Sequence, residues 1–169
     1  SIQVYYGNGR GKTTAALGLG IRAAGVGKQV IMVQFLKKKH SDTLDFLKKL
    51  EPELQIFRFE KAACGYSDLS PKEKQEQMLN IKNALGYSRK VLDTGQCDLL
   101  ILDEIFGLVD YNIITIEELM DLIAVKKDSM DLILTGRNLP DEVREIADCV
   151  YSIQREKEKT PEILAQGNF

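Results

Sequence analysis

The sequence contains few residues of several chemically informative kinds. Of its 169 residues, one is histidine (His40) and none is tryptophan. Around a single histidine we can build neither a Ser-His-Asp nor a Cys-His arrangement. The three cysteines, Cys64, Cys97 and Cys149, are odd in number and far apart, so they predict neither a disulfide framework nor a zinc site. They are typical of free thiols in a reducing cytoplasm.

Strong net charge and long apolar runs are absent as well. The net charge of −2 gives no general electrostatic attraction to nucleic acid. No stretch approaches the roughly 20 apolar residues that span a membrane, and no signal peptide is visible. We therefore expect a cytoplasmic protein that binds neither nucleic acid nor membrane. The length predicts a single domain, residues 1–169, in which the charged and turn-rich residues 155–169 form a tail or lid.

The most informative stretch is a glycine-rich loop near the N-terminus. An apolar and aromatic run, Ile2–Tyr6, leads into Gly7-Asn8-Gly9-Arg10-Gly11-Lys12-Thr13-Thr14, and an Ala/Leu-rich helical segment follows. Strand, glycine-rich loop, Lys-Thr and helix make a P-loop. Glycines let successive N–H groups face an anion, and the helix N-terminus adds a positive dipole end. Lys12 supplies a full charge, and the Thr13 hydroxyl is placed to bind Mg²⁺.

The loop is one residue shorter than the usual pattern. In G-x-x-x-x-G-K-[ST] the first glycine stands six residues before the lysine, but here that position is Tyr6 and the first glycine is Gly7. A shorter loop is expected to hold a polyphosphate in a different pose from an ordinary kinase or ATPase. The alternative is a chance glycine-rich turn, which the flanking strand and helix argue against.

A second chemical group follows the apolar run Leu99–Leu102. Asp103 and Glu104 are the acidic strand end that holds Mg²⁺ opposite a P-loop, and Glu104 either activates water or holds the metal. The alternative is a pair of solvated acids. Arg10 in the loop and Arg137 after a later strand are candidates to stabilise phosphate charge; a surface arginine in a turn is the alternative for Arg137.

Strand and helix signals alternate through the chain, which predicts an α/β fold of three layers with a mainly parallel sheet of about six strands. The predicted strands are Ile2–Tyr6, Gln29–Phe35, Leu54–Phe59, Asp98–Asp103, Asp131–Thr135 and Cys149–Ile153. The predicted helices are Lys12–Ala24, Asp42–Leu50, Pro71–Asp93, Thr115–Val125 and Pro140–Ala147. Ser70 with Glu73, and Thr115 with Glu118, are spaced as capping boxes. Ligands of such folds bind at the C-terminal ends of the strands.

Several motifs together resemble a known family. GNGRGKTTAALGLGIRAAG, VQFLK, LLILDEI and LTGR occur in this order between Val4 and Ile153. The combination resembles the P-loop-type ATP:corrinoid adenosyltransferases (cob(I)yrinic acid a,c-diamide or cob(I)alamin adenosyltransferases), and the shortened GNGxGKTT loop is its most specific part.

The resemblance implies a P-loop NTPase fold of the RecA-like type, a homodimer, and transfer of the 5′-deoxyadenosyl group of ATP to Co(I) of a corrinoid. Tripolyphosphate would leave, and the reaction would serve adenosylcobalamin biosynthesis or salvage. A flavodoxin-type reductase is the implied partner. Residues Gly7–Thr14 and Arg137 would bind ATP, and Thr13, Asp103 and Glu104 would hold Mg²⁺. Lys12 and Glu104 would be the catalytic residues.

The corrinoid half of the site departs from the family pattern. Members commonly carry Gly-Phe-Thr-Trp before the long helix, where this chain has Gly65-Tyr66-Ser67-Asp68. The resemblance implies corrinoid contacts by Gln34, Phe35, Lys37 and Tyr66. Read from the residues alone, Tyr66 either stacks on a planar ligand or covers the core, and Lys37 belongs to a basic loop that is either solvated or recognises an acidic group.

Two other functions remain open at this point. One is a P-loop ATPase or phosphotransferase that acts on another small molecule, and the other is a nucleotide-dependent interaction or nucleic-acid-binding module. The short loop and VQFLK argue against the first. The acidic balance of the chain argues against nucleic acid.

Overall fold

The computed structural model describes residues 1–38, 46–61 and 69–157. The elements are β1 (Ile2–Tyr6), α1 (Lys12–Gly25), β2 (Val30–Lys38), the 3₁₀ helix η1 (Lys48–Leu50), β3 (Leu54–Lys61), α3 (Pro71–Thr94), β4 (Leu99–Asp103), α4 (Ile105–Asp110), α5 (Ile116–Ala124), β5 (Asp131–Gly136), α6 (Asp141–Ile146) and β6 (Cys149–Ser152).

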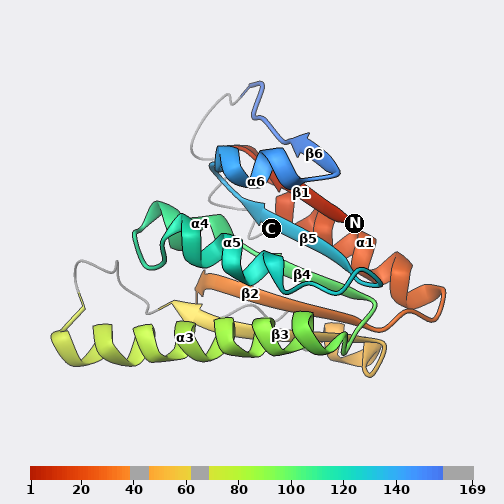
Figure 1. Cartoon of the computed structure of the whole chain (residues 1–169), viewed down its shortest axis with the longest axis horizontal. Coiled ribbons are helices and arrows are strands. Elements are labelled where there is room, and N and C mark those ends of the chain that lie inside the picture. The colour runs from red at the N-terminus through yellow and green to blue at the C-terminus, as the bar shows by residue number, and fades with distance from the viewer. Residues whose placement is uncertain (39–45, 62–68, 158–169) are drawn as a thin grey trace.

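One sheet of six strands organises the chain (Figure 1). Its order is β3-β2-β4-β5-β1-β6, and every pair of neighbours is parallel. The predicted parallel α/β fold is confirmed. Because β5 lies between the P-loop strand β1 and the acidic strand β4, the order is that of a RecA-like P-loop fold. The C-terminal ends of all six strands meet at one edge, where the predicted site residues were expected.

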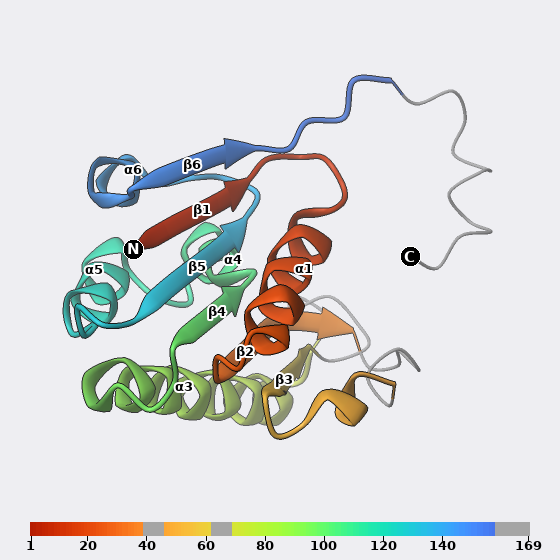
Figure 2. The ribbon, with the colours of Figure 1, turned by 90° about the vertical axis from the view of Figure 1, so that its right-hand side faces the viewer.

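Helices cover the sheet unequally on its two faces. Figure 2 shows α1 on one side, and α3, α4, α5 and α6 on the other. Two apolar clusters correspond to these faces. In β2, Val30 and Met32 belong to the cluster under α1, whereas Ile31, Val33 and Phe35 belong to the larger cluster on the opposite face. Strand β2 is therefore apolar on both sides, as expected for a central strand of a parallel sheet between helical layers.

Both predicted capping boxes are present. At α3, Glu73 N–H donates to Ser70 Oγ (3.3 Å), and Ser70 N–H donates to Glu73 Oε2 (2.8 Å). The same exchange joins Thr115 and Glu118 at the start of α5. These bonds satisfy donors that the first helical turn leaves without partners. None of the helices in the described ranges combines the length and apolarity needed to cross a membrane.

The sequence prediction was incomplete in two places. It assigned no element to residues 105–114, where the short helix α4 begins directly after β4 with four buried residues; six residues are too few for a helical periodicity to be visible. The predicted helix Asp42–Leu50 lies partly outside the described residues, and its described part includes the 3₁₀ helix η1. Of the predicted tail, residues 155–157 are described and exposed.

The packing at the start of β4 predicts a difference between two cysteines. Cys97 is 6% exposed, and burial raises the pKa of its thiol to about 11, whereas Cys149 on β6 is exposed. Because the thiolate is the reactive species, we expect a thiol reagent at pH 8 to modify Cys149 in the native protein and Cys97 only in denaturant. Mass spectrometry of a Cys64→Ser variant would measure both rates. Equal native rates would contradict the burial of Cys97.

Candidate active site

The glycine-rich loop is packed tightly against two other parts of the chain. Gly7 N–H donates to the carbonyl oxygens of Gly136 (3.2 Å) and Arg137 (3.1 Å), and Gly9 N–H donates to that of Ile153 (2.9 Å). A Cβ atom on Gly7 would overlap the Ile153 carbonyl oxygen, and one on Gly9 would lie 2.8 Å from it. Gly7 also has φ +125°, a conformation that side chains disfavour. The protein's own backbone therefore requires both glycines.

The polar side chains of the loop have different surroundings. Lys12 Nζ donates to the Gly9 carbonyl oxygen at 2.9 Å, so the ammonium group lies over the loop. Asn8 Oδ1 accepts a hydrogen bond from Arg155 N–H (3.2 Å), on the segment that follows β6. Arg10 and Thr14 are exposed to solvent. The loop therefore carries the positive charges of Lys12 and Arg10 at this sheet edge.

Tyr6 takes the place of the first P-loop glycine. Arg144 of α6 donates from Nη2 to the Tyr6 hydroxyl (3.4 Å), and its guanidinium carbon lies 5.3 Å from the ring centroid. This hydrogen bond lowers the pKa of Tyr6. The aromatic residue thus joins the end of β1 to α6 where other P-loops begin to turn.

Asp103 is the centre of the site. Its side chain is fully buried. Thr13 Oγ1 donates to the two carboxylate oxygens, at 2.9 and 3.0 Å. Thr135 Oγ1 donates to Oδ1 at 2.7 Å, and Gln34 Nε2 donates to Oδ2 at 3.2 Å. Three donors from α1, β5 and β2 therefore surround the carboxylate and satisfy the hydrogen-bonding capacity of a buried polar group.

Glu104 is positioned by the backbone rather than by its side chain. Its φ of +62° turns the chain sharply from β4 into α4, and its N–H donates to Thr135 Oγ1 at 2.9 Å. Thr135 therefore links the two acidic residues, since it accepts from Glu104 and donates to Asp103. Within the described residues, the Glu104 carboxylate has no hydrogen-bonding partner, so it is available to a ligand at this edge.

The donor set fits a magnesium ion. Thr13 uses its hydroxyl proton toward Asp103, which leaves oxygen lone pairs for a cation. A hydroxyl and two carboxylates are hard oxygen ligands, and Mg²⁺ in nucleotide sites is held by few protein groups together with phosphates and water. The described parts of the chain contain no cluster of three or more His, Cys, Asp or Glu residues that could hold a metal ion.

The remaining predicted residues are not all at the surface of the site. Arg137 is exposed beside the start of the loop, which its carbonyl oxygen helps to fix. Phe35 is fully buried and stacks on Phe59, with ring centroids 6.5 Å apart. The strand period of two places Phe35 on the face opposite to Gln34, so the structure gives Phe35 a packing role in place of a ligand contact. The side chain of Lys37 and all of Tyr66 lie outside the described residues.

Three participants were missed from the sequence. Thr135 ends an apolar strand, and its polarity there was the available signal. Arg58 lies within the predicted strand Leu54–Phe59 and was given no functional role, although its Nε and Nη2 both donate to Gln34 Oε1 (3.2 and 3.1 Å). The contact of Ile153 with the loop left no sequence signal, because it is made by backbone atoms.

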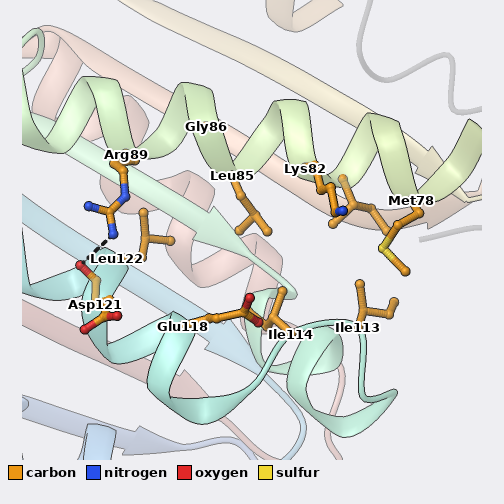
Figure 3. A pocket seen from close by; sticks show the side chains of 11 residues that line it. Met78, Lys82, Leu85, Gly86, Arg89, Ile113, Ile114, Glu118, Asp121 and Leu122 are labelled. Atoms are coloured by element: carbon orange, nitrogen blue, oxygen red, sulfur yellow. Dashed lines mark hydrogen bonds between the residues drawn. The ribbon is translucent and has the colours of Figure 1, made fainter.

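A cavity of about 250 Å³ lies away from this site, between α3 and α5. Figure 3 shows apolar side chains such as Leu85 and Ile114 along its walls, and Arg89 hydrogen-bonded to the Asp121 carbonyl oxygen (3.4 Å) at one end. The cavity contains none of the residues of the glycine-rich loop or of the acidic pair.

Comparison with known proteins identifies the family. The sequence pattern of the ATP:corrinoid adenosyltransferase BtuR/CobO/CobP family matches residues 1–166. The chain belongs to this family. It is 30% identical over 153 residues to the corrinoid adenosyltransferase of Escherichia coli K12, which covers 90% of this chain and 76% of that protein. The corrinoid adenosyltransferase CobA of Salmonella typhimurium matches with the same identity and coverage.

The predicted resemblance to the P-loop-type ATP:corrinoid adenosyltransferases is thereby confirmed. The protein is an ATP:corrinoid adenosyltransferase by membership, and its site combines a P-loop with an acidic strand end. A crystal structure of a DNA replication initiation factor matches with a TM-score of 0.42 and 16% identity, over 90% of this chain and 39% of that one. At this TM-score, the match supports no inference about the chain.

The close packing of the loop leads to a prediction about glycines. We expect Gly7→Ala to lower the free energy of unfolding by about 2–4 kcal/mol, because the new Cβ meets the Ile153 carbonyl and the backbone is left-handed. Gly18→Ala is the matched control in α1. Its Cβ would have nothing within 4 Å, so it should stabilise the helix by about 0.5–1 kcal/mol. Urea unfolding would measure both, and equal effects would contradict the packing of residue 153 on the loop.

Proposed function

We propose that this protein transfers the 5′-deoxyadenosyl group of ATP to the Co(I) centre of a corrinoid and releases tripolyphosphate. One observation carries the proposal: in a chain of this family, a P-loop one residue short lies beside the Thr13–Asp103 hydrogen bond and the uncommitted Glu104 carboxylate. We infer that the short loop holds the triphosphate so that C5′, rather than the γ-phosphorus, faces the second substrate.

The proposed step is a nucleophilic substitution. The electron pair of Co(I) forms a Co–C bond to C5′, and the C5′–O5′ bond breaks with its electron pair passing to tripolyphosphate. Cobalt is formally oxidised from Co(I) to Co(III). Because the cobalt is the nucleophile, no protein nucleophile or general base is required. The protein's part is to align the two substrates and to stabilise the departing charge.

Charge on the leaving group would be stabilised mainly by the glycine-rich loop. The loop amides of residues 7–14 other than those of Gly7 and Gly9, together with Lys12, Arg10 and Arg137, would face the triphosphate. A bound phosphate would draw the Lys12 ammonium from its present position over Gly9. When bound, Mg²⁺ would neutralise phosphate charge, and Thr13, Asp103 and Glu104 would hold it.

The wider setting follows from the same family pattern. We propose a cytoplasmic homodimer that receives its Co(I) substrate from a flavodoxin-type reductase and serves adenosylcobalamin biosynthesis or salvage. Tyr66 and Lys37 are the proposed corrinoid contacts. Gln34, which the sequence also suggested, would act on the metal side of the site, since its amide is bonded to Asp103.

An anaerobic assay tests the reaction directly. The protein is mixed with Mg-ATP and chemically reduced corrinoid, the visible spectrum is followed, and the phosphate product is identified. We expect a light-sensitive adenosylated corrinoid and one tripolyphosphate for each molecule formed. Steady release of ADP without adenosylation would instead indicate an ordinary P-loop ATPase and would overturn the proposal.

Removal of the loop lysine should abolish turnover. In Lys12→Ala we expect the rate of adenosylation to fall by about 100-fold or more, because a full charge on the leaving group loses its partner. Lys90→Ala, on the exposed surface of α3, is the control and should retain the unaltered rate. Full activity of Lys12→Ala would contradict the assignment of the glycine-rich loop as the phosphate-binding site.

Removal of the Glu104 charge should change the metal dependence. We expect Glu104→Gln to raise the Mg²⁺ concentration for half-maximal activity by roughly tenfold, because an amide is a weaker ligand than a carboxylate. Glu117→Gln, which alters an exposed carboxylate in the first turn of α5, should leave the titration unchanged. An unchanged titration for Glu104→Gln would refute its role as a metal ligand.

A further inference from the structure

A row of polar side chains crosses the sheet beneath the start of α1. Arg58 of β3 and Asp103 of β4 are both in register with Gln34 of β2. On the same face, the preceding positions of these strands are apolar: Ile56, Met32 and Ile101. The face under α1 thus changes from apolar to polar at its last row, beside the glycine-rich loop. Arg58 ends this row on the side of the sheet farthest from β1.

Hydrogen bonds along this row converge on Asp103, which accepts from both sides. Arg58 donates twice to Gln34 Oε1 (3.2 and 3.1 Å), Gln34 Nε2 donates to Asp103 Oδ2 (3.2 Å), and Asp103 accepts from the Thr13 hydroxyl. Gln34 is 5% exposed and Asp103 is fully buried, so water has little access to replace these bonds. Buried polar groups that lose such partners are costly.

The chemistry at both ends of the amide fixes its orientation. A guanidinium group has only donors, and an ionised carboxylate has only acceptors. Gln34 can satisfy both neighbours in one orientation alone, with Oε1 toward Arg58 and Nε2 toward Asp103. The reversed amide would place an oxygen 3.2 Å from Asp103 Oδ2. Arg58 therefore determines which atom of the Gln34 amide faces Asp103, although the side chains of Gln34 and Asp103 lie between Arg58 and Thr13.

We propose that Arg58 is a positioning residue for the metal-bound nucleotide, acting through the Gln34 amide on the Asp103 carboxylate and hence on the Thr13 hydroxyl. With Asp103 held by Gln34, the Thr13 proton is directed to the carboxylate, and the lone pairs of the hydroxyl oxygen would remain for the cation. Groups bonded to metal ligands commonly change metal affinity 10- to 100-fold when they are lost. The inference rests on the proposed function, because it assumes that Mg-ATP binds at Gly7–Thr14.

The test is a double-mutant cycle on ATP affinity. Calorimetric titration gives the Kd of ATP in Mg²⁺ and in EDTA for the unaltered protein, Arg58→Met, Gln34→Met and the double variant. For each single variant we expect the Kd in Mg²⁺ to rise about tenfold, and the Kd in EDTA to change by less than about twofold. In the Gln34→Met background, loss of Arg58 should have no further effect, since its route to Asp103 is already broken.

Two further variants separate positioning from strand stability. Arg58→Lys keeps the positive charge but cannot donate two hydrogen bonds from a fork. We therefore expect an intermediate Kd of ATP in Mg²⁺. If Arg58→Met does not fold, Arg58→Lys replaces it in the test. Arg89→Met removes an arginine at the cavity between α3 and α5 and should leave both Kd values unchanged. A merely structural Arg58 would lower the thermal unfolding midpoint and leave the ratio of the two Kd values unaltered.

The outcomes distinguish this inference from the proposed function. Additive effects of Arg58→Met and Gln34→Met would overturn the relay, because they would show that Arg58 acts without Gln34. An unchanged Kd ratio in Arg58→Met, with metal-dependent binding intact in the unaltered protein, would overturn it while leaving the proposed function standing. If the unaltered protein bound ATP equally in Mg²⁺ and in EDTA, the proposed metal site would fail and the relay with it.

Discussion

The burial of one carboxylate constrains the whole C-terminal edge of the sheet. A charge without solvent needs hydrogen-bond donors around it, and Asp103 receives them from Thr13, Thr135 and Gln34. These donors belong to α1, β5 and β2, so the carboxylate ties the first helix to three adjacent strands. The strand register and the start of the helix must all be correct for this one group to be satisfied. The phosphate loop is held at the end of that assembly.

The chemistry of the site and the packing of the core are therefore two properties of the same strands. Along β2, Met32 contributes to the core under α1 and Gln34, the next residue on that face, contributes to the site. A small displacement of the sheet would alter both at once. This explains how a family whose reaction needs accurate alignment of two substrates can use a rigid parallel sheet as its support.

Much of this arrangement could be predicted from the sequence, because it depends on local patterns. The glycine-rich loop, the acidic pair Asp103 and Glu104 and the caps at Ser70 and Thr115 each lie within a few neighbouring residues, and their spacing carries the physics. The six strands could be recognised by their apolar runs. The order of the strands in the sheet could not be predicted from the sequence. Positions 58, 34 and 103 become neighbours only through the order β3-β2-β4. The packing role of Phe35 was also missed. Adjacent residues of a strand face opposite layers of the fold, so Phe35 and Gln34 lie on different faces of the sheet.

The contact of the glycine-rich loop with Ile153 links the length of the loop to the end of the last strand. Because the backbone of residue 153 occupies the space beside Gly7 and Gly9, an extra residue in the loop would have nowhere to go unless that segment moved outward. The short loop and the segment that follows β6 therefore form one packed unit, joined by the Gly9–Ile153 and Asn8–Arg155 hydrogen bonds.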